Sequence, residues 1–299
     1  MDQCNLFNAV NNNDAFYLQE VLIDYPDIDV NQALIASLTA LHIAAEKGYS
    51  SCVTMLIAAG ADVDKVDEHG CTALMSAIAG GQALVVVKLL QAGCDFRRAN
   101  HRNTTALHYA SRLGSAGLLQ LLLMSGARPD IWNNDGNSPL SIAITNLSAE
   151  TVQTLLLGCT HVDPNVLAPT DSCPYPLLFA LENAQYLLAL TMLMSGYRGV
   201  MEARTFFSKR ESLESSVSDD TDLERLTFIK QSVFKPLSLQ HSCRLVLRRS
   251  LGTNIWDKVE KLKLPEPLHN FVCFTELWTP LKLFTDIDLY SYFNANSDG

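Results

Sequence analysis

The sequence contains no closely paired cysteines, although eight cysteines occur among its 299 residues. They are scattered along the chain, at Cys4, Cys52, Cys71, Cys94, Cys159, Cys173, Cys243 and Cys273. Because a disulfide framework or a structural zinc site needs cysteines at short, paired spacings, we expect neither. Cysteines beside apolar residues are instead typical of buried, reduced thiols in a protein of the cytoplasm, with the nucleus as the alternative compartment.

Long apolar runs and an excess of basic residues are also missing. No uncharged apolar stretch reaches the roughly 20 residues that a membrane-spanning helix needs. The first residues, MDQCNLFNAVNNND, lack the basic start and apolar run of a signal peptide. The 22 Lys and Arg residues are outnumbered by 32 Asp and Glu, which gives a formal net charge of −10. We therefore expect neither a membrane partner nor a nucleic-acid partner.

Sequence motifs of catalysis are absent as well. There is no glycine-rich phosphate loop, no Gly-x-Ser-x-Gly nucleophile motif and no His-Glu-x-x-His zinc motif. The chain is therefore predicted not to be an enzyme and to carry no metal or cofactor. With 48% apolar and 18% charged residues, it should nevertheless bury a core of its own.

What the sequence does contain is an internal repeat of 33 residues. Segments with a hydroxyl residue followed two positions later by leucine recur from Thr39, Thr72, Thr105 and Ser138, and a further unit starts at Tyr175. Each unit has two clusters of apolar residues at helical spacing, of which Leu41, Ala44 and Ala45 are one example. Two short helices per unit are therefore predicted, and such a unit buries its apolar faces only by stacking on its neighbours.

The Thr-Ala-Leu-His segments at 39–42 and 105–108, together with the constant period, resemble the ankyrin repeat. The resemblance implies an all-α fold, a solenoid of about six repeats with short β-hairpin turns, over residues 1–200. The first unit is expected to be an atypical N-terminal cap. In this family the histidine of the motif is a structural, hydrogen-bonding residue. His42 and His108 are therefore expected to be structural rather than catalytic or metal-binding.

An ankyrin array acts as a surface, so the resemblance implies a protein target bound by the hairpin tips and first helices. Tips are expected near residues 67–69, 100–102 and 132–135, and the second of these is basic. Trp and Arg are enriched among binding hot spots. The predicted substrate-binding residues are Arg98, His101, Arg102, Trp132 and Asn133, with Trp132 as the exposed anchor. The alternative is that each is only a solvated turn residue.

Residues 201–235 are predicted to form a linker with a capping helix. Residues 208–220 are rich in serine and charge and poor in apolar residues, which predicts a flexible segment. A capping-box pattern, Thr221-x-x-Glu224, then precedes apolar residues at helical spacing, namely Leu223, Leu226, Ile229 and Val233. This amphipathic helix covers the end of the last repeat or belongs with the C-terminal region, and the sequence favours neither.

A short helix with one narrow apolar stripe is predicted within residues 238–252. The stripe consists of Leu239, Cys243, Val246 and Leu247, which share a face of the helix. Ser238 can cap the start of this helix and Gly252 can end it. The stripe packs on the protein's own core or in a shallow pocket of a partner, and the residues alone favour neither.

The pattern Ser238-Leu239-x-x-x-Cys243-x-x-x-Leu247 resembles the BC box of SOCS-box proteins, which docks on elongin C. The resemblance implies that elongin binds Leu239, Cys243, Val246 and Leu247. The segment 259–272 resembles the cullin box of the same family, which implies that a cullin binds Leu262, Leu264, Pro265, Leu268 and Phe271. Lys263 stands where that box has its first proline. An alternative alignment on Leu264-Pro265-Glu266-Pro267 keeps both prolines but puts Glu266 at an apolar position.

The chain is thus identified as a member of the ankyrin-repeat and SOCS-box family. A small helical SOCS box is expected over residues 236–275, with a C-terminal extension over 276–299. Membership implies a non-catalytic substrate-recognition subunit of an elongin–cullin ubiquitin ligase. Its partners would be elongin B and elongin C, a cullin–RING module and an unknown protein substrate. The alternative is an ankyrin scaffold or adaptor outside any ligase, whose C-terminal helices form a structural cap.

Overall fold

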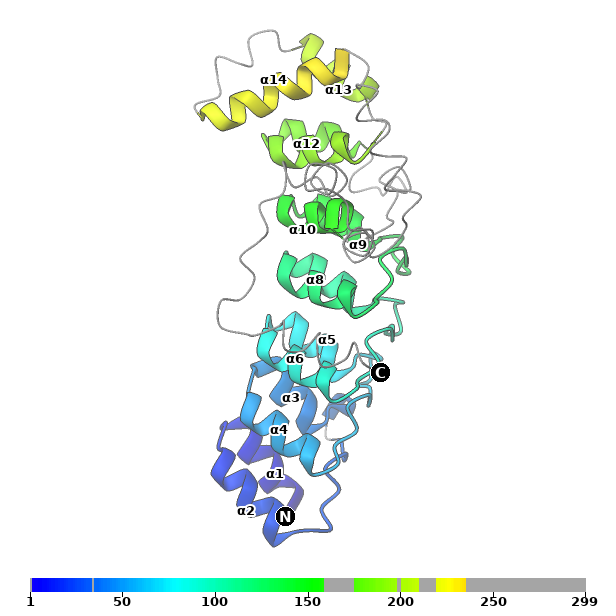
Figure 1. Cartoon of the computed structure of the whole chain (residues 1–299). Coiled ribbons are helices and arrows are strands. Elements are labelled where there is room, and N and C mark those ends of the chain that lie inside the picture. Colours follow the sequence, from blue (N-terminus) through cyan, green and yellow to red (C-terminus); the bar gives the residue numbers. More distant parts are fainter. Residues whose placement is uncertain (1, 34, 159–174, 198–199, 210–218, 235–299) are drawn as a thin grey trace, which may run out of the picture. The chain divides into compact units, whose positions relative to one another are not determined.

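The computed structural model describes residues 2–33, 35–158, 175–197, 200–209 and 219–234. Within these ranges the chain is built from helices, as Figure 1 shows, and contains no β-strand beyond isolated bridges. The described residues divide into two compact units. The first comprises the residues up to Leu118 together with Asn133–Asp135, and the second comprises Leu119–Trp132 and the residues from Gly136 on. The predicted all-α fold class is confirmed.

The first unit contains α1 to α7 and the start of α8. The bounds are α1 Asp2–Asn11, α2 Ala15–Asp24, α3 Ala40–Lys47, α4 Ser50–Ala58, α5 Ala73–Ala79, α6 Ala83–Gln91, α7 Ala106–Leu113 and α8 Ala116–Met124. A short 3-10 turn, Ile35–Ser37, precedes α3.

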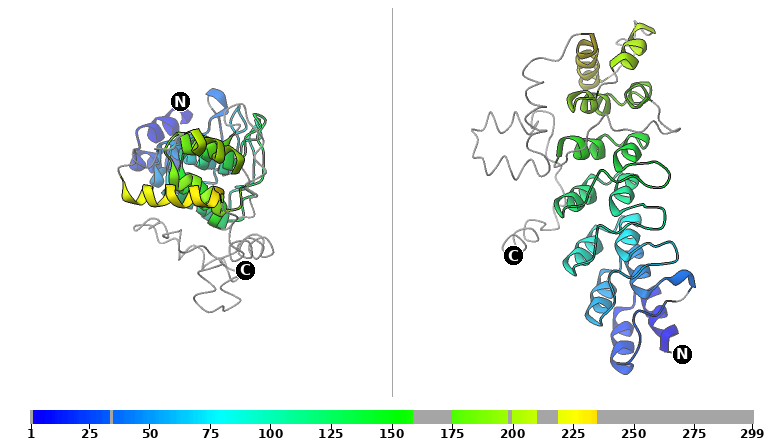
Figure 2. Two further views of the ribbon diagram at one scale, coloured as in Figure 1. Left: turned by 90° about the horizontal axis from the view of Figure 1, so that it is seen from above. Right: turned by 90° about the vertical axis from the view of Figure 1, so that its right-hand side faces the viewer.

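The helices of the first unit stack in two rows, which the right-hand view of Figure 2 shows side by side. In one row α1, α3, α5 and α7 each pack on the next, and in the other row α2, α4 and α6 do so. The first row buries the leucine of each repeat, and Leu41, Leu74 and Leu107 are each only 1% exposed. Because burying a leucine contributes roughly 1.5–3 kcal/mol, these contacts between repeats are a main source of the unit's stability.

The helices α3, α5 and α7 begin at the same position of the repeat. Their N-caps are Thr39, Thr72 and Thr105. Thr39 forms a capping box with His42: its backbone N–H and its hydroxyl lie 3.3 and 2.8 Å from Nδ1 of the imidazole. The other ring nitrogen, Nε2, lies 3.1 Å from the carbonyl oxygen of Cys71 in the next repeat, to which it donates. Thr105 and His108 repeat the box, and both histidines are buried, which confirms their structural role.

In its described residues, the second unit contains the rest of α8 and the helices α9 to α14. Their bounds are α9 Pro139–Thr145, α10 Ala149–Gln153, α11 Pro176–Glu182, α12 Tyr186–Met194, α13 Val200–Lys209 and α14 Asp220–Phe234. A π-helical turn, Thr154–Gly158, continues α10. The two-row stacking recurs here, because α9 packs on α11 and α10 packs on α12.

Helices α13 and α14 extend this stack beyond the last predicted repeat. α13 packs on α11, α14 packs on α12, and the two helices also pack on each other. α14 buries Leu226, Ile229 and Val233, and Nε of Arg204 donates to the carbonyl oxygen of Val233 at 3.0 Å. The predicted amphipathic helix is therefore present and covers the preceding repeat. The packing of α13 and α14 on α11 and α12 thus continues the two rows beyond residue 200, where the predicted ankyrin-repeat domain ends, and the domain bounds stay a prediction.

The start of α14 differs from the predicted capping box. Asp219, rather than Thr221, caps the helix, because its carboxylate accepts a hydrogen bond from the Thr221 backbone at 2.9 Å. Its carbonyl accepts another from the Leu223 backbone, also at 2.9 Å. The hydrogen bonds from Thr221 hold the pKa of Asp219 below its ordinary value. Of the predicted flexible segment, residues 208 and 209 end α13, and residues 210–218 lie outside the described residues.

We expect the free energy of unfolding to fall as the pH drops below 6.5, the ordinary pKa of a histidine. Burial lowers the pKa of His42 in the folded chain, so the unfolded chain takes up its proton first as the pH falls. The contribution is fully present above pH 6.5 and is lost below it. Urea unfolding at pH 7.5 and pH 5.5 measures the loss, which should be smaller in His42→Gln because glutamine does not titrate. Equal losses in the two proteins would contradict this expectation.

Candidate protein-binding surface

β-Hairpin turns join successive repeats in the first unit. Two isolated antiparallel bridges close them, Val66 with Thr72 and Ala99 with Thr105. In the first turn, Oδ1 of Asp67 accepts hydrogen bonds from the backbone N–H groups of His69 and Cys71, at 2.9 and 2.7 Å. A short acceptor side chain that binds its own backbone two residues on gives the turn a defined shape. The predicted hairpin tips near residues 67–69 and 100–102 are thereby confirmed.

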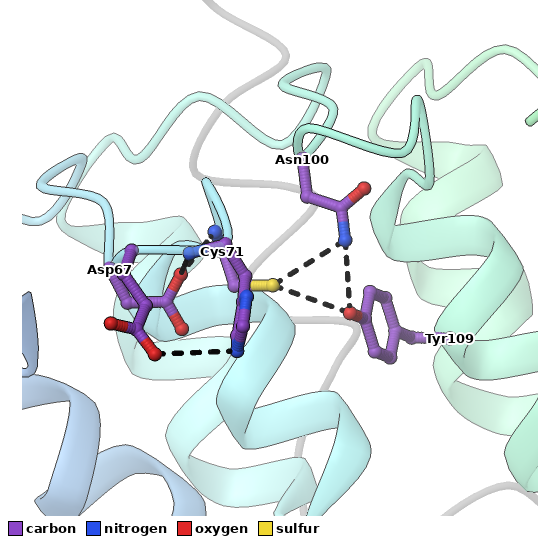
Figure 3. Close-up of polar contacts among 6 residues, drawn as sticks. Asp67, Cys71, Asn100 and Tyr109 are labelled. Atoms are coloured by element: carbon purple, nitrogen blue, oxygen red, sulfur yellow. Dashed lines mark hydrogen bonds and ion pairs between the residues drawn. The ribbon is translucent and has the colours of Figure 1, made fainter. Parts of the chain in front are cut away.

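The next hairpin is built in the same way around Asn100. Its Oδ1 accepts hydrogen bonds from the backbone N–H groups of Arg102 and Thr104, at 3.0 and 2.9 Å. An amide also has an NH₂ donor group, which the carboxylate at the equivalent position lacks. As Figure 3 shows, Nδ2 of Asn100 donates to the hydroxyl of Tyr109 at 3.2 Å and to the sulfur of Cys71 at 3.5 Å. One side chain thus holds both the tip and a residue of α7.

Tyr109 completes this polar cluster. Its hydroxyl lies 3.3 Å from the sulfur of Cys71, which belongs to the preceding repeat. Burial and the hydrogen bond with Cys71 raise the pKa of Tyr109 to about 12. The guanidinium of Arg112 lies 4.8 Å from the centroid of the partly buried ring. Tyr109 is therefore neutral near pH 7, and its orientation is set by residues of two repeats.

Backbone hydrogen bonds join each hairpin tip to the next. They run from Glu68 N–H to the Ala36 carbonyl (3.1 Å), from His101 N–H to His69 (2.9 Å) and from Asn134 N–H to Arg102 (2.9 Å). The ring of His101 also rests on Gly70, where a Cβ atom would lie 2.6 Å from Cδ2 of the imidazole. Gly70 also has a φ of +78°, which residues with a side chain rarely adopt. A larger residue here would therefore be disfavoured both by its backbone conformation and by the contact with His101. The tips therefore form one connected edge of the unit.

The structure places the predicted substrate-binding residues of the first unit in different environments. Arg98 is bound within the unit, because its guanidinium donates to the carbonyl oxygen of Asp64 at 3.0 Å and lies 3.8 Å from the carboxylate of Asp95. Arg102 is exposed, and His101 is exposed although its ring contacts Gly70. Of this pair, Arg102 keeps its charged group accessible to a partner.

Trp132 departs from the expectation that it is an exposed anchor. It is partly buried and belongs to the second unit, whereas Asn133, also partly buried, belongs to the first. The structure therefore does not bring Trp132 together with His101 and Arg102 within one unit. The binding roles of the five predicted residues stay a prediction.

The charge of the first unit changes sign along the chain. Residues 1–95 carry twelve acidic side chains and three lysines, whereas residues 96–118 carry four arginines and no acid. These arginines are Arg97, Arg98, Arg102 and Arg112. Asn100 and Tyr109 lie in this basic segment and were not singled out from the sequence. The sequence already indicated that this segment is basic, but it gave no sign of the contacts that Asn100 and Tyr109 make between repeats.

The described residues hold little that points to catalysis. In those ranges, no group of three His, Cys, Asp or Glu side chains is placed to hold a metal ion. Burial, reinforced by Asp64 and Asp95, raises the pKa of Cys94 to about 12, and burial also raises that of Cys52. Protonated thiols are poor nucleophiles. No helix of the described part is long and apolar enough to cross a membrane.

The predicted elongin-binding and cullin-binding residues lie outside the described residues. The first set is Leu239, Cys243, Val246 and Leu247, and the second is Leu262, Leu264, Pro265, Leu268 and Phe271. The helix predicted within residues 238–252 and the extension over 276–299 lie outside them too.

Protein-family models match both parts of the chain. The model for ankyrin repeats (3 copies) matches residues 6–100 and 82–168, which together cover more than half of the chain. The model for the SOCS box matches residues 235–273, a range that includes every residue predicted to bind elongin or cullin. A comparison with curated proteins gives no match.

The two matched families define the general role of the chain. Ankyrin repeats joined to a SOCS box support a substrate adaptor for elongin–cullin ligases in general, and both families are typically non-catalytic. A SOCS box generally binds elongin B/C and cullin modules. The repeats, seen as stacked helix pairs with capped first helices, are followed by the SOCS-box match, and the chain therefore belongs to the ankyrin-repeat and SOCS-box family.

Proposed function

We propose that this chain is the substrate-recognition subunit of an elongin–cullin ubiquitin ligase. The observation that carries the proposal is the order of its parts along the chain. The stacked helices of the second unit continue to Phe234, and the SOCS-box match begins at residue 235. The two adjoin in the sequence, so we expect a target bound to the repeats to stay close to whatever the box recruits.

Proximity is the mechanism that this arrangement supports. The repeats hold the target protein, while the box recruits elongin B and C and then a cullin–RING module with its charged conjugating enzyme. Joining both binding events on one chain makes ubiquitin transfer effectively intramolecular, with effective concentrations on the order of millimolar for short connections. In this mechanism the chain supplies no catalytic group.

The rigidity of the hairpin edge supports its use as a recognition surface. The tips are held by Asp67 and Asn100 and are joined to one another through backbone hydrogen bonds. A surface that is already ordered loses less conformational entropy when a partner binds, which improves affinity. Because α13 and α14 pack on α11 and α12, our proposal extends the repeat region from residue 1 through α14. The SOCS box over residues 236–275 and an extension follow it.

The apolar stripe of residues 239–247 is proposed to dock on elongin C. In the full-length chain, Leu239→Asp with Cys243→Asp should weaken elongin B–C binding by at least about 30-fold, or roughly 2 kcal/mol, because two charges would enter an apolar pocket. Isothermal titration of purified protein with elongin B–C measures the change.

A variant of the opposite helix face provides the matched control. His241→Asp with Arg248→Gln changes the formal charge by a similar amount but leaves the stripe intact, so it should bind elongin B–C like the wild type. Urea unfolding of each variant separates a binding defect from a folding defect. If the stripe variant unfolds or the wild type fails to bind, the stripe is internal and the elongin contact is refuted.

The cullin contact is proposed to involve Leu262, Leu264, Pro265, Leu268 and Phe271. Lys263 places a charge where the family has an apolar proline, which should cost affinity unless the amine reaches water at the rim. We expect Lys263→Pro to raise the affinity of the elongin-bound chain for the cullin several-fold while leaving elongin binding unchanged. Surface plasmon resonance on immobilised cullin measures both proteins, and an unchanged or weaker affinity would show that Lys263 is not a defect of the box.

The departure at Lys263 also favours a second candidate function, an ankyrin scaffold outside any ligase. In that case the chain would bind its target, with or without elongin, and would not assemble with a cullin. Wild-type chain that binds elongin B–C but recruits no cullin would select the scaffold over the ligase subunit.

A further inference from the structure

The basic segment of the first unit stands out against its surroundings. The two neighbouring hairpins differ in charge: the earlier tip carries Asp67 and Glu68, whereas the later one carries Arg97, Arg98 and Arg102. The chain as a whole has a formal net charge of −10, so these arginines give the hairpin a charge opposite to that of the protein. A local field of this kind selects partners of opposite charge and speeds their encounter.

Two of these arginines keep their charge available. Arg98 is bound to the carbonyl of Asp64 and faces Asp95, but neither Arg97 nor Arg102 forms an ion pair with a described residue. Both are exposed, and the guanidinium of Arg97 lies 5.3 Å from the ring centroid of Phe96. A guanidinium that already rests on an aromatic ring loses less freedom when it binds an anion.

The backbone that carries Arg102 is fixed from both sides. Its N–H donates to Oδ1 of Asn100 at 3.0 Å, and its carbonyl accepts the N–H of Asn134 at 2.9 Å. The same Asn100 donates to the hydroxyl of Tyr109, and the guanidinium of Arg112 lies over the Tyr109 ring. Asn100 therefore ties the charged tip to a partly exposed aromatic side chain on α7, as can be followed in Figure 3.

We propose that the hairpin of residues 97–105, together with Tyr109, binds an acidic segment of the target protein. Arg97 and Arg102 bind its carboxylates through charge-assisted hydrogen bonds, for which the planar guanidinium fork is suited. Tyr109 offers a partly exposed ring whose hydroxyl is bound to Asn100 of the same hairpin. This inference rests on the proposed function, because it names the class of target segment that the ligase subunit selects.

The neighbouring charges favour a short acidic segment over a nucleic acid. Asp67 and Glu68 lie on the adjoining tip, whose His69 carbonyl accepts the N–H of His101. A long polyanion that crossed several tips would meet these carboxylates, whereas a few glutamates or aspartates can stay on one hairpin. The repulsive tip therefore limits the length of anion that the hairpin accepts.

Fluorescence anisotropy with a fluorescein-labelled hexaglutamate peptide tests the proposal on the full-length chain. Hexaglutamate should bind at 50 mM salt and weaken at least tenfold at 300 mM, and hexaglutamine should not bind. Arg97→Glu with Arg102→Glu should lower the affinity for hexaglutamate at least tenfold. The neutral pair Arg97→Gln with Arg102→Gln should give an intermediate loss, and circular dichroism checks that each variant stays folded.

Lys47→Glu with Lys88→Glu is the matched control, because it makes the same change of formal charge on α3 and α6. A loss in this control equal to that of the arginine pair would overturn the proposal, since only net charge would then matter. Absence of hexaglutamate binding by the wild type, or tighter binding of a single-stranded twelve-nucleotide oligothymidine, would overturn it as well. Elongin B–C binding is measured on the same samples. If it persists while hexaglutamate fails to bind, only this inference falls, whereas loss of elongin binding by the wild type removes the proposed function itself.

Discussion

The need of each two-helix repeat to bury its leucines against a neighbour is the constraint on which the rest of the structure depends. Leu41, Leu74 and Leu107 are almost fully buried, and each lies in a first helix that packs on a neighbouring first helix of the same unit. The buried capping boxes reinforce this contact, because the imidazole of His42 reaches the backbone of the following repeat. Stacking fixes the spacing of the hairpins, so adjacent tips can form hydrogen bonds that no single repeat could make.

A regular scaffold of this kind leaves the hairpin residues available for recognition. Asn100 shows how a different residue at one repeat position adds contacts between repeats. At the equivalent position of the preceding turn, Asp67 only shapes its own hairpin. The amide of Asn100 does the same and also donates to Tyr109 and Cys71, so hydrogen bonds join the tip to α7 and to the preceding repeat. Residues 97–109 are thus both basic and tightly hydrogen-bonded, whereas residues 1–95 of the same unit are acidic.

Local signals in the sequence predicted the repeats well, but they could not predict contacts between residues that are far apart in the sequence. Thr39, Thr72, Thr105 and Ser138 all cap helices as their 33-residue spacing indicates, because capping depends on residues within one turn. The stacking of α13 on α11 was not predicted, and the stacking of α14 on α12 was only one of two alternatives, because residues 200–234 lack the repeat motif and their packing depends on burial against distant helices. The binding of Arg98 to the Asp64 carbonyl and the partial burial of Trp132 likewise follow from tertiary packing, which no local pattern encodes.

We assign the repeat surface of the chain to the target and its C-terminal box to the ligase machinery. Hydrogen–deuterium exchange of the full-length chain, with and without elongin B–C, tests this division most directly. We predict slower amide exchange within residues 238–249 when elongin B–C is present, and unchanged exchange in the hairpin of residues 97–105. Protection of the hairpin with no change within residues 238–249 would contradict the division, because elongin would then occupy the surface assigned to the target.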